Sequence, residues 1–162
     1  MKRLETDELW IAIDAYLQDC LVPGDEALDA ALVASEKAGL PQINVAPNQG
    51  KLLMLLARAI GARRILEVGT LGGYSTIWLA RGLPADGRLI TLEANPEYAA
   101  IARANIARAG LAGQVEVRIG RAQDTLPDLA SEAPFDLIFI DPTSLARPAI
   151  SNGRSRCRAA AR

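Results

Sequence analysis

A chain of 162 residues, half of them hydrophobic, is long enough for one folded domain with its own core. The formal net charge of -1 gives no electrostatic case for binding nucleic acid or an anionic membrane, and no apolar run approaches the ~20 residues of a membrane span. Histidine is absent from the sequence, which excludes Ser-His-Asp and Cys-His catalysis and any His-ligated metal.

The N-terminus and the cysteines favour a cytoplasmic protein. Two basic residues but no apolar run follow Met1, so this segment does not resemble a secretory signal. Cys20 and Cys157 are far apart in the sequence. A disulfide between them is one alternative, and two free thiols in a cytoplasmic protein are what we expect.

Three helices are predicted before any strand. The first spans residues 4–21, the second begins at Asp25 after Pro23-Gly24, and the third follows Pro47 and stops at Gly61. Their apolar sides carry Leu9, Ile13 and Leu17 in the first, Leu28, Ala31, Leu32 and Ser35 in the second, and Leu52, Leu53, Leu56 and Ile60 in the third. We expect the last set to face inward.

The pattern then changes to short apolar strands that alternate with helices. The predicted strands are residues 63–70, 87–94, 114–120 and 135–141, separated by helical stretches at 72–83, 95–110 and 121–132. Such alternation predicts right-handed βαβ units and a parallel sheet covered on both faces. The predicted fold class is α/β, with a Rossmann-like strand order 3-2-1-4.

The residues that follow the strands are candidates for a ligand site, because open parallel sheets bind ligands beyond their carboxyl ends. Glu67 and Gly69 end the first strand, Glu93 the second and Asp141 the fourth. In the first turn, EVGTLGGYS, the glycines allow close backbone approach, and Ser75 lies where a helix N-terminus favours a carboxylate or a phosphate. A tight turn without a ligand is the alternative.

Two features of this region separate the candidate cofactors. Leu71 replaces the second glycine of the G-x-G-x-x-G fingerprint, which disfavours a dinucleotide pyrophosphate. Glu93 follows Gly69 by 24 residues, where an acid hydrogen-bonds ribose hydroxyls, unless it is a solvated charge at a strand end. A turn suited to a carboxylate beside an acid suited to ribose describes S-adenosylmethionine better than NAD.

Several sequence segments resemble the cation-dependent O-methyltransferases of the caffeoyl-CoA and catechol type. The segments are INVAPNQGKLL, ILEVGTLGGYST and LIFID, and the similarity covers roughly residues 30–141. The resemblance implies a methyltransferase core preceded by helices that help to cover substrate and cofactor. It also implies transfer of a methyl group to a hydroxyl of a small catechol-like or phenolic acceptor.

The resemblance also implies roles for individual residues. Val45 matches a backbone contact to the methionine part of the cofactor, and Ser75 a ligand of its carboxylate. Glu93 matches the ribose ligand, and Ala122 the neighbour of the adenine. Glu67, Gly69 and Thr70 match the floor of the cofactor pocket, and Asp141 matches a metal ligand near the methionine amino group. Trp78 and Tyr98 are interpreted as packing residues.

The segment after Asp141 departs from the family pattern. The family continues Asp-Ala-Asp-Lys and later supplies an Asp-Asn pair, whereas this chain reads Asp141-Pro142-Thr143-Ser144. The lysine that would deprotonate the acceptor is absent, so no catalytic residue is assigned. Asp141 alone is an incomplete site for Mg²⁺, which requires several oxygen ligands.

Residues 142–162 contain five arginines and no Asp, Glu or Lys. A shift of reading frame at Pro142 would restore Asp-Lys-Pro, and it would turn residues 150–157 into an amphipathic helix. This hypothesis competes with a natural divergent tail. In either case the later strands of the family sheet are expected to be missing.

The sequence therefore predicts one methyltransferase domain with three parts. Residues 1–61 form N-terminal helices, residues 62–141 the cofactor-binding core, and residues 142–162 an atypical Arg-rich tail. We expect impaired methyl transfer, with a non-enzymatic S-adenosylmethionine-binding or interaction protein as the alternative. The fourth strand would be a sheet edge, which predicts a homodimer or larger species joined near residues 135–150.

Overall fold

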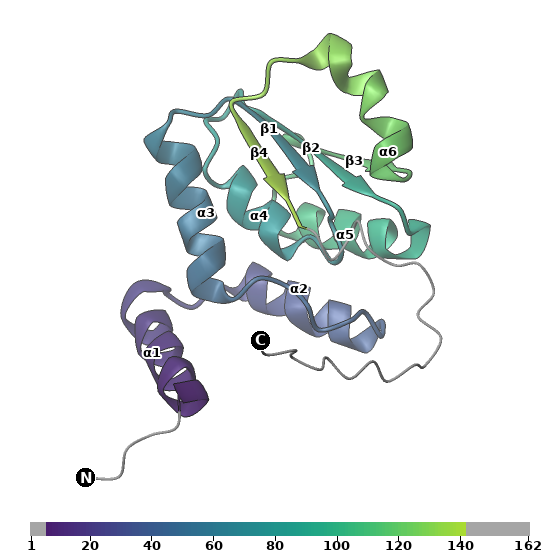
Figure 1. The fold of residues 1–162 in the computed structure, drawn as a ribbon. Helices are drawn as coiled ribbons and strands as arrows, with labels where there is room; N and C mark the ends of the chain where they lie inside the picture. Colours follow the sequence, from purple (N-terminus) through teal and green to yellow (C-terminus); the bar gives the residue numbers. More distant parts are fainter. Residues whose placement is uncertain (1–5, 142–162) are drawn as a thin grey trace, which may run out of the picture.

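The computed structural model describes residues 6–141, which form one parallel sheet with helices on both faces (Figure 1). Three helices come first, namely α1 (Thr6–Leu21), α2 (Glu26–Lys37) and α3 (Pro47–Ala59). Strands and helices then alternate as the sequence predicts: β1 (Arg64–Val68), α4 (Tyr74–Ala80), β2 (Arg88–Glu93), α5 (Pro96–Arg108), β3 (Val115–Ile119), α6 (Ala122–Thr125), the 3-10 helix η1 (Pro127–Glu132) and β4 (Leu137–Ile140).

The strand order is β3-β2-β1-β4, and all three pairings are parallel, which confirms the predicted α/β class and order. Val68 at the end of β1 lies opposite Leu92 of β2 and Ile140 of β4. The residues that follow these three positions therefore emerge at one edge of the sheet. This register brings Gly69, Glu93 and Asp141 to the same place.

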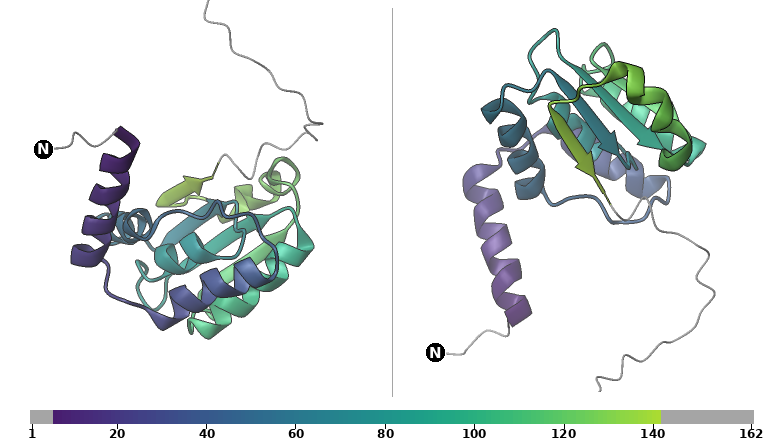
Figure 2. Two further views of the ribbon diagram at one scale, coloured as in Figure 1. Left: turned by 90° about the horizontal axis from the view of Figure 1, so that it is seen from below. Right: turned by 45° about the horizontal axis from the view of Figure 1, so that its top comes forward.

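The two faces of the sheet have separate apolar clusters. On one face α4 and α5 pack on the strands around Ile65, Ile77, Leu89 and Ile106. Helix α2 forms an outer layer on α4 and α5 (Figures 1 and 2). On the other face Leu129 of η1 closes a smaller cluster with Leu66, Val68, Ile90 and Leu92.

Helix α2 begins at the predicted position because Asp25 caps it. The Asp25 carboxylate accepts hydrogen bonds from the backbone N–H groups of Ala27 and Leu28, at 3.1 and 2.9 Å. It also pairs with Arg81 at the end of α4, at 2.6 Å, and this partner holds the pKa of Asp25 below its usual value. The predicted apolar side of α2 is confirmed, since Leu28 and Ala31 are buried.

The predicted inward face of α3 is wrong for most of its residues. Of that set only Leu53 packs against the core, and the side chains with about half their surface exposed are Leu52, Leu56 and Ile60. Helix α3 instead turns Gly50 and Ala57 toward α4, and a Cβ on Gly50 would overlap the Trp78 indole. Small residues allow the close approach, so the leucine stripe is left outside.

Helix α1 stands away from the sheet and packs on α3 (Figures 1 and 2). Asn48 of α3 donates to Asp14, at 3.0 Å, and Lys51 donates to the carbonyl of Leu21. The stripe predicted to be apolar is only partly covered, and the exposed large side chains of α1 are Leu9, Trp10, Ile11, Ile13, Tyr16 and Leu21. No helix among residues 6–141 is long and apolar enough to cross a membrane.

Strand β4 is an edge of the sheet within the described part of the chain, as predicted. Its residues Ile138 and Ile140 are more than half exposed, while Leu137 and Phe139 pack against the main cluster. Cys20 is an exposed free thiol. The predictions made for Cys157 and for residues 142–162 lie outside the described residues.

Candidate functional site

A cleft of about 720 Å³ opens at the carboxyl ends of β1, β2 and β4. A smaller hollow of about 20 Å³ adjoins it, and Pro41, Gly69, Leu71 and Asp141 line both. The wider cleft lies toward the start of α5, and the narrow one lies between α2, the segment before α3 and the start of α4. Their position is the one where open parallel sheets bind ligands.

The glycine turn between β1 and α4 forms the wall shared by the two hollows. Gly69 donates its N–H to the carbonyl of Leu92, at 3.0 Å, and has a φ of 102°. Leu71 has a φ of 50°, an uncommon left-handed conformation for a non-glycine residue. Gly73 closes the turn by donating to the carbonyl of Thr70, at 2.8 Å, and it is the N-cap of α4. The turn is thus held in a shape that most residues avoid.

Glu93 is fixed at the mouth of the wider cleft. One carboxylate oxygen accepts the N–H of Leu71 at 2.8 Å, and the other accepts the N–H of Asn95 at 2.9 Å. The residue is 7% exposed, and it lines the cleft. Because a carboxylate oxygen has two lone pairs, each oxygen retains capacity to accept a second hydrogen bond. The arrangement suits a ligand that offers two neighbouring hydroxyl groups.

Glu67 lies beneath the floor of the narrow hollow, completely buried. Its two oxygens accept the hydroxyl protons of Ser75, at 2.6 Å, and Thr76, at 2.5 Å. Burial raises the pKa of Glu67 to about 7, opposed by these hydroxyl donors, with a small further rise from the charge of Asp141. Ser75 lines the hollow, but its hydroxyl proton is already donated to Glu67.

Asp141 follows β4 and lines both hollows. Its N–H donates to the carbonyl of Val68, at 2.9 Å, which continues the pairing of β4 with β1. Within residues 6–141 no group of three or more His, Cys, Asp or Glu side chains lies in an arrangement that could hold a metal ion. A single carboxylate provides too few oxygen ligands for Mg²⁺.

The remaining predicted contacts fall in different places. Val45 and the backbone of Thr70 line the narrow hollow, and the buried Thr70 hydroxyl is 2.6 Å from that of Thr91. Ala122 begins α6 and packs against the smaller apolar cluster, so it lines neither hollow. The structure therefore brings six of the predicted contacts to the two hollows, namely Val45, Gly69, Thr70, Ser75, Glu93 and Asp141. Ala122 and Glu67 line neither hollow, and Glu67, predicted as part of the pocket floor, is instead buried and contacts the narrow hollow through the Ser75 hydroxyl.

Two aromatic residues interpreted as packing differ in position. Trp78 is buried in the main cluster, as expected. Tyr98 is half-buried and lines the wider cleft together with Asn95 and Glu97. Its place in the first turn of α5, shortly after Glu93, is a sequence signal that could have indicated that Tyr98 lines the cleft.

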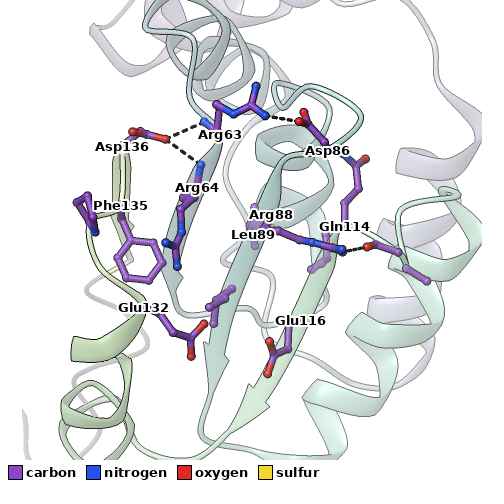
Figure 3. Close-up of a pocket in the computed structure, with 15 residues that line it drawn as sticks. Arg63, Arg64, Asp86, Arg88, Leu89, Gln114, Glu116, Glu132, Phe135 and Asp136 are labelled. Carbon is purple, nitrogen blue, oxygen red and sulfur yellow. Dashed lines mark hydrogen bonds and ion pairs between the residues drawn. The ribbon is translucent and has the colours of Figure 1, made fainter.

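A separate hollow, of about 790 Å³, lies at the opposite, amino-terminal ends of the strands (Figure 3). Its acids already have partners: Asp86 pairs with Arg63, Asp136 accepts the backbone N–H groups of Arg63 and Arg64, and Glu116 and Glu132 pair with Arg118. The guanidinium of Arg64 lies 5.6 Å from the centre of the Phe135 ring. This hollow contains none of the predicted site residues.

Comparison with known proteins identifies the family. A family model described as O-methyltransferase matches residues 24–147, which is most of the chain. The chain belongs to the O-methyltransferase family. Curated relatives include a catechol O-methyltransferase of Mycobacterium tuberculosis, 60% identical over 80% of this chain, and one of Niastella koreensis, 54% identical over 83%. The chain spans 58% and 62% of the lengths of these two relatives.

Solved structures show the same core. An O-methyltransferase from Bacillus cereus in complex with SAH matches with a TM-score of 0.80 and 54% identity, over 83% of this chain and 62% of that one. An O-methyltransferase from Streptomyces achromogenes, in complex with SAM, matches with a TM-score of 0.80 and 50% identity, over 85% and 63%. The Rossmann-like methyltransferase fold predicted from the sequence is thereby confirmed.

Proposed function

We propose that the cleft at the carboxyl ends of β1, β2 and β4 binds S-adenosylmethionine. The observation that carries the proposal is the Glu93 carboxylate, which two backbone N–H groups orient at the mouth of a cleft beside a glycine turn. Glu93 would accept hydrogen bonds from the ribose hydroxyls, since its oxygens retain free lone pairs. Tyr98, in the same cleft, offers an aromatic surface to the adenine.

The narrow hollow would hold the methionine part of the cofactor. The first turn of α4 presents backbone N–H groups there, and these groups favour a carboxylate. Ser75 would bind this carboxylate through its backbone N–H, because its hydroxyl proton is donated to Glu67. Asp141, which lines both hollows, lies where its carboxylate would attract the ammonium group.

NAD is the less favoured cofactor. The Leu71 side chain projects where a dinucleotide fingerprint has its second glycine, and this residue lines both hollows. A pyrophosphate approaching the turn would meet that side chain. S-adenosylmethionine has no pyrophosphate, so the same leucine does not obstruct it.

Titration calorimetry with S-adenosylhomocysteine, S-adenosylmethionine and NAD tests the proposal. Glu93→Ala is expected to weaken S-adenosylhomocysteine binding by about 1–3 kcal/mol, the usual value of hydrogen bonds to a charged group. Glu36→Gln, an exposed acid on α2, is the matched control and should leave the affinity unchanged. An unchanged affinity in Glu93→Ala, or binding of NAD alone, would overturn the assignment.

We further propose that the chain derives from an enzyme that methylates a hydroxyl of a small catechol-like or phenolic acceptor. The names of the two curated relatives support this substrate class. The cofactor supplies an electrophilic methyl group on a sulfonium. The residues described here would bind and orient that cofactor, while no lysine lies in the two hollows to take the acceptor proton.

A divalent metal does not fit the residues described here. Asp141 is the predicted ligand, and the part of the chain seen in the structure provides no cluster that would complete the coordination. The second candidate function is the alternative expected from the sequence, a non-enzymatic S-adenosylmethionine-binding or interaction protein. Turnover of a catechol acceptor that a chelator abolishes would exclude this second function.

We also propose that the chain forms a homodimer or a larger species. The exposed isoleucines of β4 support contact at the sheet edge. The apolar side chains exposed on α1 and α3 offer a second surface, because ordinary monomers rarely expose so many together.

A further inference from the structure

We propose that Asn105 of α5 is a positioning residue, which holds the glycine turn in the conformation that the cofactor site requires. This inference rests on the proposed function, since it assigns the turn a ligand. Asn105 is 1% exposed and lines neither hollow, and it reaches the turn through the carbonyl of Gly72. Its side chain connects α5 with the turn and with the carbonyl of Ala31 on α2.

The peptide unit between Gly72 and Gly73 is hydrogen-bonded at both its oxygen and its N–H, and Asn105 supplies the first of these two bonds. Its Nδ2 donates to the carbonyl of Gly72, at 2.9 Å. The N–H of the same peptide unit, that of Gly73, donates to the carbonyl of Thr70, at 2.8 Å. With both its oxygen and its N–H bonded, this peptide has no freedom to rotate without breaking a buried hydrogen bond.

The orientation of Asn105 is itself determined. Its Oδ1 accepts a hydrogen bond from Arg108, at 2.7 Å, which leaves the amide nitrogen to face the turn. The same nitrogen is 3.4 Å from the carbonyl of Ala31 on α2. An amide is the only neutral side chain that donates two hydrogen bonds and accepts from a guanidinium at the same place.

The turn is held by close packing as well as by the Asn105 hydrogen bond, and together these contacts form what we call the clamp. A Cβ on Gly72 would overlap the hydroxyl of Ser35 on α2, and a Cβ on Gly73 would lie 3.4 Å from the Cα of Ala102 on α5. Helix α2 therefore leaves no room for a side chain at Gly72, and α5 lies within van der Waals distance of the turn at Gly73.

The strained conformation of Leu71 explains why such a clamp is needed. With a φ of 50°, Leu71 lies in the left-handed region, which costs a non-glycine residue on the order of 1 kcal/mol or more. In this conformation its N–H reaches the Glu93 carboxylate at 2.8 Å. Asn105 thus acts on the ribose ligand through two intermediates, the Gly72 carbonyl and the Leu71 backbone.

Asn105→Leu tests the inference, because leucine has nearly the same volume and no polar atom. The control is Ile106→Val on the same helix, which perturbs the core at a residue 2% exposed without touching the turn. We expect Asn105→Leu to weaken S-adenosylhomocysteine binding roughly 3- to 10-fold, as for one lost hydrogen bond. At equal loss of thermal stability, Ile106→Val should change the affinity less than about 2-fold.

Hydrogen exchange of the ligand-free chain provides the second readout. The amides of Leu71 and Gly73 should exchange faster in Asn105→Leu than in Ile106→Val, while amides in β1 and β2 exchange alike. Equal affinities and equal exchange at the turn in the two variants would overturn the proposal. Asn105→Ser, with a shorter side chain, replaces the leucine variant if that protein does not fold.

The two proposals fail in different ways. If the unmodified chain binds no S-adenosylhomocysteine, the proposed function is wrong, and the exchange of the Leu71 and Gly73 amides still decides whether Asn105 holds the turn. If the chain binds the ligand and Asn105→Leu matches Ile106→Val both in affinity and in exchange at the turn, the function stands and the clamp is wrong.

Discussion

Replacing Glu67 with glutamine should make the protein more stable at alkaline pH, because Glu67 is a fully buried acid. Burial raises the pKa of Glu67 from the usual 4.5 to about 7. Between these two values the folded state holds the proton and the unfolded state has released it. Stability must therefore fall as pH rises through this window, and the loss is complete above the folded pKa.

The size of the effect follows from the shift. A rise of about 2.5 pKa units corresponds to roughly 3 kcal/mol that the charged carboxylate costs the folded state at pH 8. Glutamine keeps the shape of the side chain and never ionises. Its amide NH₂ group replaces one of the two oxygens that accept from Ser75 and Thr76, and the loss of that hydrogen bond costs about 1 kcal/mol of stability. Glu67→Gln should thus gain about 2 kcal/mol over the parent protein at pH 8, and be slightly less stable at pH 5.

Urea unfolding between pH 5 and 8.5 measures this difference. Groups that titrate equally in both proteins cancel, so the difference in unfolding free energy isolates Glu67. Glu36→Gln, an exposed acid, should follow the parent protein at every pH. Parallel curves for Glu67→Gln and the parent would refute the reasoning, because they would show that Glu67 titrates alike in the folded and unfolded states.

Two further predictions concern packing and assembly. Gly50→Ala should destabilise the fold by about 1–2 kcal/mol in thermal or urea unfolding, because the new Cβ overlaps the Trp78 indole and outweighs the gain in helix propensity. Gly24→Ala, where no atom lies within 4 Å, is its control, and equal stabilities would contradict the close approach of α3 to α4. If copies associate through α3, Leu52→Ser should lower the mass measured by light scattering. If they associate through β4, Ile138→Ser should do so, and a monomeric parent protein would exclude both surfaces.

The order of the elements and the position of the acids could be predicted from the sequence alone. Strand and helix periods are local signals, and a parallel βαβ order places every strand's carboxyl end at one edge of the sheet. Glu93 and Asp141 could therefore be brought to one site without coordinates, and the structure places both there. The glycine turn could also be predicted from the sequence, because its shape depends on residues that are adjacent in the chain.

Which apolar faces are covered and which side-chain hydrogen bonds are made could be seen only in the folded chain. A periodic stripe shows that a helix has an apolar side, but whether a neighbour covers it depends on packing, and α3 turns Gly50 inward while its leucines stay outside. The donation of the Ser75 hydroxyl to Glu67 and of the Asn105 amide to Gly72 joins residues far apart in sequence or on different elements. Spacing cannot report such bonds, because they depend on where the elements meet in space.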